Sequence, residues 1–172
     1  IVWAAADPTG SALQRAQIIK GYLHNGEHQE RIYDVACADD LQVDPATGRC
    51  PDNGAGVNLA DCSVTADKGA GELKALWRDP DFDPRQEAFY YVRVLENPSC
   101  RWSTLQCQAA GVNPFARDCA AQAAAATARA QQDGASGDVF GKCCTDPGAE
   151  AFYSPLIQER AWTSPIWYQP AR

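Results

Sequence analysis

Eight cysteines constrain the fold of this chain more than any other feature of its sequence. They are Cys37, Cys50, Cys62, Cys100, Cys107, Cys119, Cys143 and Cys144. An even number of cysteines in a chain of 172 residues is typical of a disulfide framework formed in an oxidising compartment. The alternative is a metal site, but structural zinc sites usually carry two cysteines separated by a short run of other residues, and none occurs here. We therefore expect disulfides, and a periplasmic or secreted location.

The cysteines fall into two clusters, and each cluster has an odd number of members. Three stand before residue 70 and five stand after residue 99. If all eight are oxidised, at least one bridge must join the two clusters. In the chain-entropy model, a bridge that closes a loop of ~15 residues contributes about 3 kcal/mol. That is large beside the stability of a whole domain, about 5–15 kcal/mol.

Charge and hydropathy exclude several classes of function. The chain carries 15 Lys and Arg against 22 Asp and Glu, a net charge of −7. General nucleic-acid binding and binding to anionic membranes need a positive field, so we expect neither. No apolar run is long enough to span a membrane. The chain begins with Ile1 and contains no methionine, so we expect it to be a piece of a longer, processed protein.

Strand-like patterns dominate the sequence outside its alanine-rich part. Candidate strands lie at 1–5, 16–23, 30–37, 57–65, 73–77, 88–96 and 157–168. Asn25-Gly26 is a strong hairpin signal between two of them. Segment 88–96 is largely apolar on both faces, which favours a central strand covered on both sides. Pro165 confines the middle of the last strand to an edge or a bulge.

Residues 109–150 have a different composition. Asn113-Pro114 is a helix-start signal, an alanine-rich run follows, and Asp133-Gly134 is a stop signal. We interpret this segment as a helical excursion stapled by disulfides. The predicted fold is therefore mainly β: one antiparallel β-sandwich-like domain over residues 1–172, of five to seven strands, with a helical insertion at 109–150.

No recognisable catalytic motif is present. His24 and His28 flank the Asn25-Gly26 turn, so solvent-exposed turn histidines are favoured over a metal pair. The alternating carboxylates of 79–83 suit calcium, but the interleaved prolines and the missing EF-hand glycine favour a rigid acidic turn. Several aromatic residues could form a sugar-binding platform or simply pack in the core: Tyr90, Tyr91, Trp102, Tyr153, Trp162, Trp167 and Tyr168. We expect no metal or other cofactor in this chain.

Several long phrases of the sequence carry a family resemblance. They are QIIKGY at 17–22, YDVA at 33–36, WRDPDFDP at 77–84, FYYVRVLENPSCRWST at 89–104 and QERAWTSPIWY at 158–168. In this order they resemble the C-terminal end of the bacterial domain-of-unknown-function 3604 family. The resemblance covers nearly the whole chain except the alanine-rich insertion.

The resemblance implies a partner for this chain. Members of the family are larger, exported bacterial proteins, and their N-terminal part is similar to metal-dependent phosphoesterases of the polymerase-and-histidinol-phosphatase type. The Gly-Asp-Leu-His-x-His-like metal motif of that part is absent from these 172 residues. The chain is therefore implied to be the accessory C-terminal β-domain of a metal-dependent hydrolase, partnered by the N-terminal catalytic portion, and we expect no catalysis by it alone. A stand-alone lectin-like module and a purely structural disulfide-rich domain are the alternatives.

Polar residues in the two most family-like phrases are the candidates for a ligand site or a domain interface. Charges with apolar neighbours must be paired or directed at a partner. Two tryptophans stand close to these charges and could stack on an arginine or on a ligand. The candidate set is Arg93, Glu96, Arg101, Trp102, Glu159, Arg160 and Trp162. A closed network between strands and an anion site facing a partner are both compatible with this set.

Overall fold

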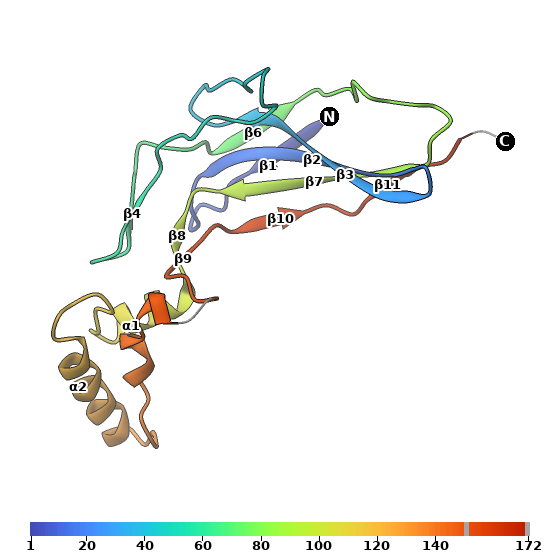
Figure 1. Ribbon diagram of the computed structural model, residues 1–172. Coiled ribbons are helices and arrows are strands. Elements are labelled where there is room, and N and C mark those ends of the chain that lie inside the picture. The colour runs from blue at the N-terminus through green and yellow to red at the C-terminus, as the bar shows by residue number, and fades with distance from the viewer. Residues whose placement is uncertain (150–151, 171–172) are drawn as a thin grey trace. The chain divides into compact units, whose positions relative to one another are not determined.

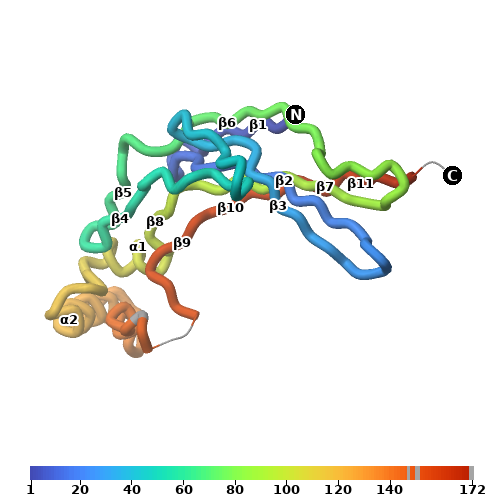
Figure 2. The backbone as a smooth tube through the Cα atoms, turned by 45° about the horizontal axis from the view of Figure 1, so that its top comes forward, coloured from blue at the N-terminus to red at the C-terminus, as the bar shows by residue number. Residues whose placement is uncertain are grey.

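The computed structural model describes residues 1–149 and 152–170. The chain divides into two compact units, which are described separately. The first, called here the β unit, comprises Ile1–Ala55, Ala66–Asn97 and Gln158–Arg172. The second, called the helical unit, comprises Gly56–Thr65 and Pro98–Ile157. Figure 1 shows the elements of both units, and Figure 2 traces the path of the backbone through them.

A five-stranded antiparallel sheet forms the β unit. Its strands lie in the order β10 (Arg160–Trp162), β7 (Ala88–Glu96), β2 (Leu13–His24) and β3 (Glu27–Cys37). β11 (Ile166–Tyr168) pairs with the same side of β7 as β10, so these two short strands share one edge. β2 and β3 are joined by Asn25-Gly26, both with positive φ, as a two-residue hairpin turn of type I′ requires.

A second layer covers one face of this sheet, called here the upper face. It consists of β1 (Val2–Ala5) paired with β6 (Glu72–Ala75). Val2 and Leu73 of this layer pack against Leu13, Ala16 and Ile18 in the main hydrophobic core. The fold is therefore mainly β and sandwich-like, as the sequence predicts.

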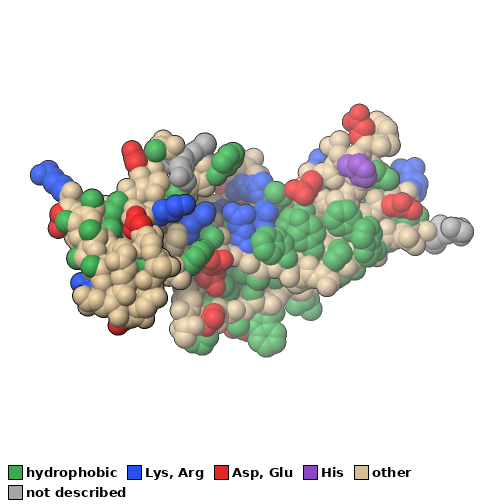
Figure 3. Space-filling view, turned by 90° about the horizontal axis from the view of Figure 1, so that it is seen from below, with side chains coloured by type: hydrophobic (Ala, Val, Ile, Leu, Met, Phe, Trp, Pro, Cys, Tyr) green, Lys and Arg blue, Asp and Glu red, His purple; other side chains and the backbone are tan. Residues whose placement is uncertain are grey.

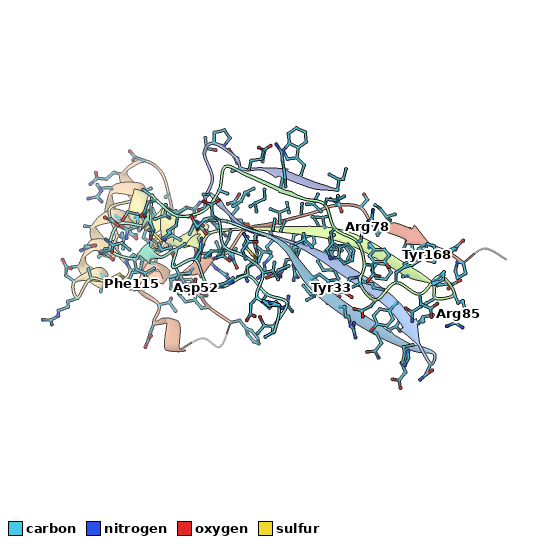
Figure 4. All side chains as sticks on the ribbon, turned by 90° about the horizontal axis from the view of Figure 1, so that it is seen from above. Tyr33, Asp52, Arg78, Arg85, Phe115 and Tyr168 are labelled. Carbon is cyan, nitrogen blue, oxygen red and sulfur yellow. A yellow bond between two sulfur atoms is a disulfide. The ribbon has the colours of Figure 1, made fainter. Side chains whose placement is uncertain are left out.

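A buried ion pair fixes the loop that crosses the upper face. Lys20 Nζ donates to Asp79 Oδ2 at 2.6 Å, and both side chains are almost fully buried. The Tyr90 hydroxyl donates to the same carboxylate oxygen at 2.7 Å. Trp77 packs between Tyr33 and Tyr90, with ring centroids 5.0 and 6.3 Å away. Figure 4 views this side and labels Tyr33.

Disulfides hold the helical unit together. Its helices α1 (Trp102–Ala109) and α2 (Cys119–Gln132) are joined to the short helix η1 (Gly141–Cys144) by the bridges Cys107–Cys143 and Cys119–Cys144. It also contains the two-stranded pairs β4 (Val57–Asn58) with β5 (Ser63–Val64), and β8 (Ser99–Cys100) with β9 (Leu156–Ile157). A second short helix, η2, spans Pro147–Ala149.

All eight cysteines are oxidised. Cys37–Cys50 lies within the β unit, and Cys62–Cys100 joins the two cysteine clusters. Cys143 and Cys144 are neighbours in the sequence but are not bonded to each other, since each forms a disulfide with a different partner. Four disulfides indicate an oxidising environment. Within the part of the chain that the structure describes, no helix has the length and apolarity needed to cross a membrane.

Several local predictions are corrected by the structure. Segment 57–65 is a tight hairpin of two short strands and not one strand. The main helix begins at Cys119 and not after Pro114, because turns occupy 114–118, and the Asn113 side-chain oxygen accepts from the Phe115 amide at their start. Helix α1 was not predicted. β7 is central in its sheet, but within the β unit a second layer covers only one of its faces.

Candidate functional site

The face of the sheet turned away from β1 and β6, called here the lower face, holds the candidate site. Cross-strand pairing puts directly opposed residues on the same face. The rows Arg15–Leu95–Arg160, Gln17–Arg93–Trp162 and Gly21–Phe89–Trp167 therefore lie on it. Figure 3 views the molecule from below and shows basic side chains next to a hydrophobic band. The lower face thus has a basic end and an aromatic end.

A buried carboxylate organises the basic end. The Asp34 side chain is fully buried and accepts hydrogen bonds from Gln17 Nε2 at 2.6 Å and from the Cys50 backbone amide at 2.7 Å. Arg49 Nη1 lies 3.3 Å and Arg15 Nη1 3.6 Å from its oxygens. The Cys37–Cys50 disulfide ties the loop that carries Arg49 and Cys50 to β3. Two arginines therefore face the single negative charge of Asp34, which leaves an excess of positive charge around it.

Arg93 extends this network toward the sheet edge. Its Nε donates to Gln17 Oε1 at 2.8 Å, while Gln17 donates to Asp34. Opposite Arg93 stands Trp162, which is 58% exposed, and Arg160 is exposed two residues earlier. Within the described residues, neither Arg160 nor the terminal amino groups of Arg93 have an ion-pair or hydrogen-bond partner. Free N–H donors therefore lie beside an exposed indole.

Gly21 makes the aromatic end possible. An added Cβ at Gly21 would stand 2.1 Å from the Phe89 ring, so only glycine lets that ring lie against β2. Phe89 in turn packs against Trp167, with ring centroids 5.1 Å apart, and against Tyr91 at 6.3 Å. Trp167 remains 69% exposed. The result is an aromatic surface in close contact with β2.

A groove of about 490 Å³ opens at this aromatic end. Phe89 and Trp167 line it on one side, and the β2–β3 hairpin lines it on the other. Its polar rim contains hydrogen-bonding side chains of both strands and of the C-terminal segment: His28, Gln29, Glu30, Glu87 and Gln169. An apolar wall with planar polar groups at the rim is typical of a small-molecule site.

The structure brings only part of the predicted candidate set together. Arg93, Arg160 and Trp162 share the lower face. Glu96 instead accepts from the Ser11 amide at 3.3 Å. Burial raises the pKa of the Glu96 carboxyl; the Ser11 hydrogen bond opposes that rise and the charge of Glu159 adds to it.

Arg101 and Trp102 belong to the helical unit, at the start of α1. Arg101 Nε is buried there without a partner among the described residues, and Trp102 is 64% exposed. The expectation that Arg101 and Arg160 share one site stays a prediction, because the two residues lie in different units.

The acidic turn at 79–83 serves as a structural anchor. Asp81 accepts hydrogen bonds from Arg31 and from the Tyr33 hydroxyl, while Asp83 pairs with Arg85. These carboxylates are therefore directed at separate cationic partners and not at one common point. No group of three or more metal-ligating side chains occurs among the residues described.

Comparison with protein families identifies a matching family model. A family model described as a protein of unknown function, DUF3604, matches residues 1–130. The chain belongs to this family. The matched residues include β2, β3 and β7. They end before β10 and β11, which form one edge of the sheet. No curated protein and no solved structure matches the chain.

Sequence reasoning missed half of the site in this family member. Arg15, Asp34, Arg49 and Gly21 were not singled out. Strict alternation along 13–24 and 27–37 would place Arg15, Gln17 and Gly21 on one face, so the periodicity contained that signal. Arg49 lies in an irregular loop 15 residues beyond Asp34, and nothing in the sequence pairs the two.

Proposed function

We propose that this chain is an accessory, ligand-binding β-domain of an exported metal-dependent hydrolase, whose catalytic metal motif lies outside these residues. The periplasm or the cell exterior is its place of action, in agreement with four disulfides. The parent activity follows from the sequence resemblance, which is an argument by analogy at the level of a family. The lower face is the part of the chain that meets the ligand.

One observation carries the binding role. The exposed Trp162 and Arg160 of the edge strand β10 lie beside Arg93 of β7, whose terminal amino groups have no partner among the described residues. Exposed aromatics beside arginines on a fixed scaffold are the usual composition of binding hot spots. Exposure alone does not distinguish Trp162, since Trp3 is exposed as well; its position opposite Arg93 and two residues from Arg160 does.

The proposal is tested first on the source protein. Intact-mass and peptide analysis should find a longer precursor that carries an upstream His-x-His motif. The purified 172-residue chain should show no turnover of phosphoester, sulfate-ester or glycoside substrates. A mature protein that consists of these residues alone would contradict the accessory role, and so would turnover that purifies with this chain.

The structural-domain alternative makes a different prediction for the lower face. If the face only stabilises the fold, Trp162→Ala in the source protein changes its thermal stability and leaves the Michaelis constant unchanged. If the face binds ligand, the same substitution raises the Michaelis constant and leaves the melting temperature nearly unchanged. Trp3→Ala is the matched control, because Trp3 is 71% exposed on the opposite layer of the same unit.

A further inference from the structure

We propose that the ligand of the lower face is an acidic saccharide, with a uronic acid carboxylate at Arg93 and Arg160 and sugar rings stacked on Trp162 and Trp167. This inference rests on the proposed function, because it assumes that the lower face binds a ligand. It adds the chemical class of that ligand. Two independent features, the charge at one end and the aromatic surface at the other, point to it.

The basic end selects an anion. Four arginines converge there, Arg15, Arg49, Arg93 and Arg160, against the single buried carboxylate of Asp34. This local excess stands in a chain whose net charge is −7. A planar guanidinium with free amino groups matches the two oxygens of a carboxylate in a bidentate arrangement. Arg93 and Arg160 have those free groups.

The aromatic end selects a ring with an apolar face. Trp162 lies opposite Arg93 and Trp167 lies opposite Phe89, four residues further along β7. At the rise of an antiparallel strand, this spacing is about 13 Å. Both indoles are exposed on one edge, so a linear ligand can lie across both. The rim of the groove offers His28, Glu30 and Gln169 to hydroxyl groups.

The carboxylates of the groove limit the charge of the ligand. Glu30 and Glu87 stand at the aromatic end, far along the strands from the arginines. A polymer that is negative at every unit would be repelled there, as would a nucleic acid. A saccharide with an isolated acidic unit, held at the basic end, satisfies both ends. An acidic peptide satisfies the arginines but makes no specific use of two spaced indoles.

Calorimetric titration of the chain with two matched ligands tests the proposal. The first is a xylo-oligosaccharide that carries one glucuronic acid, and the second is the same backbone without it. We expect the acidic ligand to bind about tenfold more tightly than the neutral one at low salt. Raising the salt concentration should reduce this difference, because the added selectivity is electrostatic.

Two pairs of variants separate the contributions. Trp162→Ala should weaken binding of both ligands about tenfold, while Trp3→Ala should not. Arg160→Gln should weaken only the acidic ligand, while Arg78→Gln, which removes an exposed arginine from the loop that crosses the upper face, should not. Melting temperatures of all four variants, measured in parallel, establish that each is folded.

Each outcome supports or overturns the inference. Equal affinity for the two ligands, or unchanged binding by Trp162→Ala, overturns it. No binding of either ligand also overturns it, and tight binding of poly-glutamate in that case makes the lower face a protein-docking surface. The last result leaves the accessory role in place. The proposed function itself fails separately, if the precursor analysis finds no longer protein.

Discussion

Lys20 shows how a single buried charge fixes a loop. Its side chain is only 3% exposed, and it contacts the Asp79 carboxylate and the Asp81 carbonyl at 2.6 and 2.8 Å. Lys20→Met would leave Asp79 buried without its cation. We expect a loss of about 3–5 kcal/mol in the free energy of unfolding, measured by urea denaturation with the disulfides intact.

The control for Lys20 is an exposed pair in the same unit. Lys74 contacts Glu72 at 2.8 Å, with both side chains well exposed. Lys74→Met should change stability by less than about 1 kcal/mol. Equal effects of the two substitutions would show that burial does not govern the Lys20 pair.

Gly21 is the position at which the aromatic surface depends on a missing side chain. Gly21→Ala puts a methyl group where the Phe89 ring lies, so the ring must move. We expect a loss of about 1–3 kcal/mol and a change in the near-ultraviolet circular dichroism of Trp167, which packs on Phe89. At Gly71, an added Cβ has open space, so Gly71→Ala should leave the spectrum unchanged.

Single residues were only partly predictable from the sequence. Arg93 interrupts an otherwise apolar strand, which made it a candidate site residue, and the structure places it on the lower face. Lys20 interrupts another strand, but its partner lies 59 residues away in a loop. Such pairing depends on the path of the loop across the sheet, which cannot be inferred from a local sequence pattern. The contact between Asp34 and Arg49 was not predicted for the same reason.

The loop between β6 and β7 should respond to acid as one element. Burial alone would raise the pKa of Asp79, but hydrogen bonds from Lys20, Tyr90 and the Asp81 amide lower it overall. A carboxyl whose pKa is lowered on folding stabilises the native state above its unfolded value, near 3.8, and that stability is lost as pH falls through the folded value. We expect the near-ultraviolet signal of Trp77 to change in this acid range.

At high pH, the stability that the same loop contributes depends on pH in the opposite direction and falls as the pH rises. Burial, with the Asp81 carboxylate as acceptor, raises the pKa of Tyr33 to about 12. The loop therefore keeps its tyrosine hydrogen bonds throughout the neutral and mildly alkaline range. Asp79→Asn should weaken the acid transition of Trp77, because the lowered pKa of Asp79 no longer contributes to it and only that of Asp81 remains. An unchanged acid transition in that variant would contradict the role of Asp79.

The sequence predicted those elements in which a regular pattern of apolar residues extends over many positions. Segment 88–96 became β7 with the predicted bounds, and Pro165 separates β10 from β11 at the sheet edge. Helix α1 was missed because its sequence, WSTLQCQA, has neither a capping residue nor a clear apolar stripe. The helix start at Cys119 was misplaced because Asn113 closes a turn with its side chain instead of capping the helix.

At the scale of the whole molecule, the two units have different sources of stability. The fully buried core of the helical unit contains Val112, two alanines and three half-cystines, and the partly buried Phe140 packs against it. Replacing Cys107 and Cys143 by serine opens a loop with a sequence separation of 36 residues. We expect a loss of about 4 kcal/mol and of the helical circular dichroism signal at 222 nm.

The matched control is the bridge of the β unit. Cys37–Cys50 has a sequence separation of 13 residues, and its removal should cost about 3 kcal/mol. That variant should keep its helical signal, because the bridge lies in the other unit. If it loses the helices as well, the two units do not fold independently.

The sheet edge has a consequence for the order of assembly during synthesis. On one side β7 pairs with β2, which precedes it in the sequence. On its other side it pairs with β10 and β11, which follow about sixty residues later and are therefore synthesised last. Until residues 160–168 leave the ribosome, the main sheet exposes a hydrogen-bonding edge and the Phe89 ring. Both are templates for association with other chains. A nascent chain of this kind therefore has to be kept apart from its copies until translation has passed the last strand.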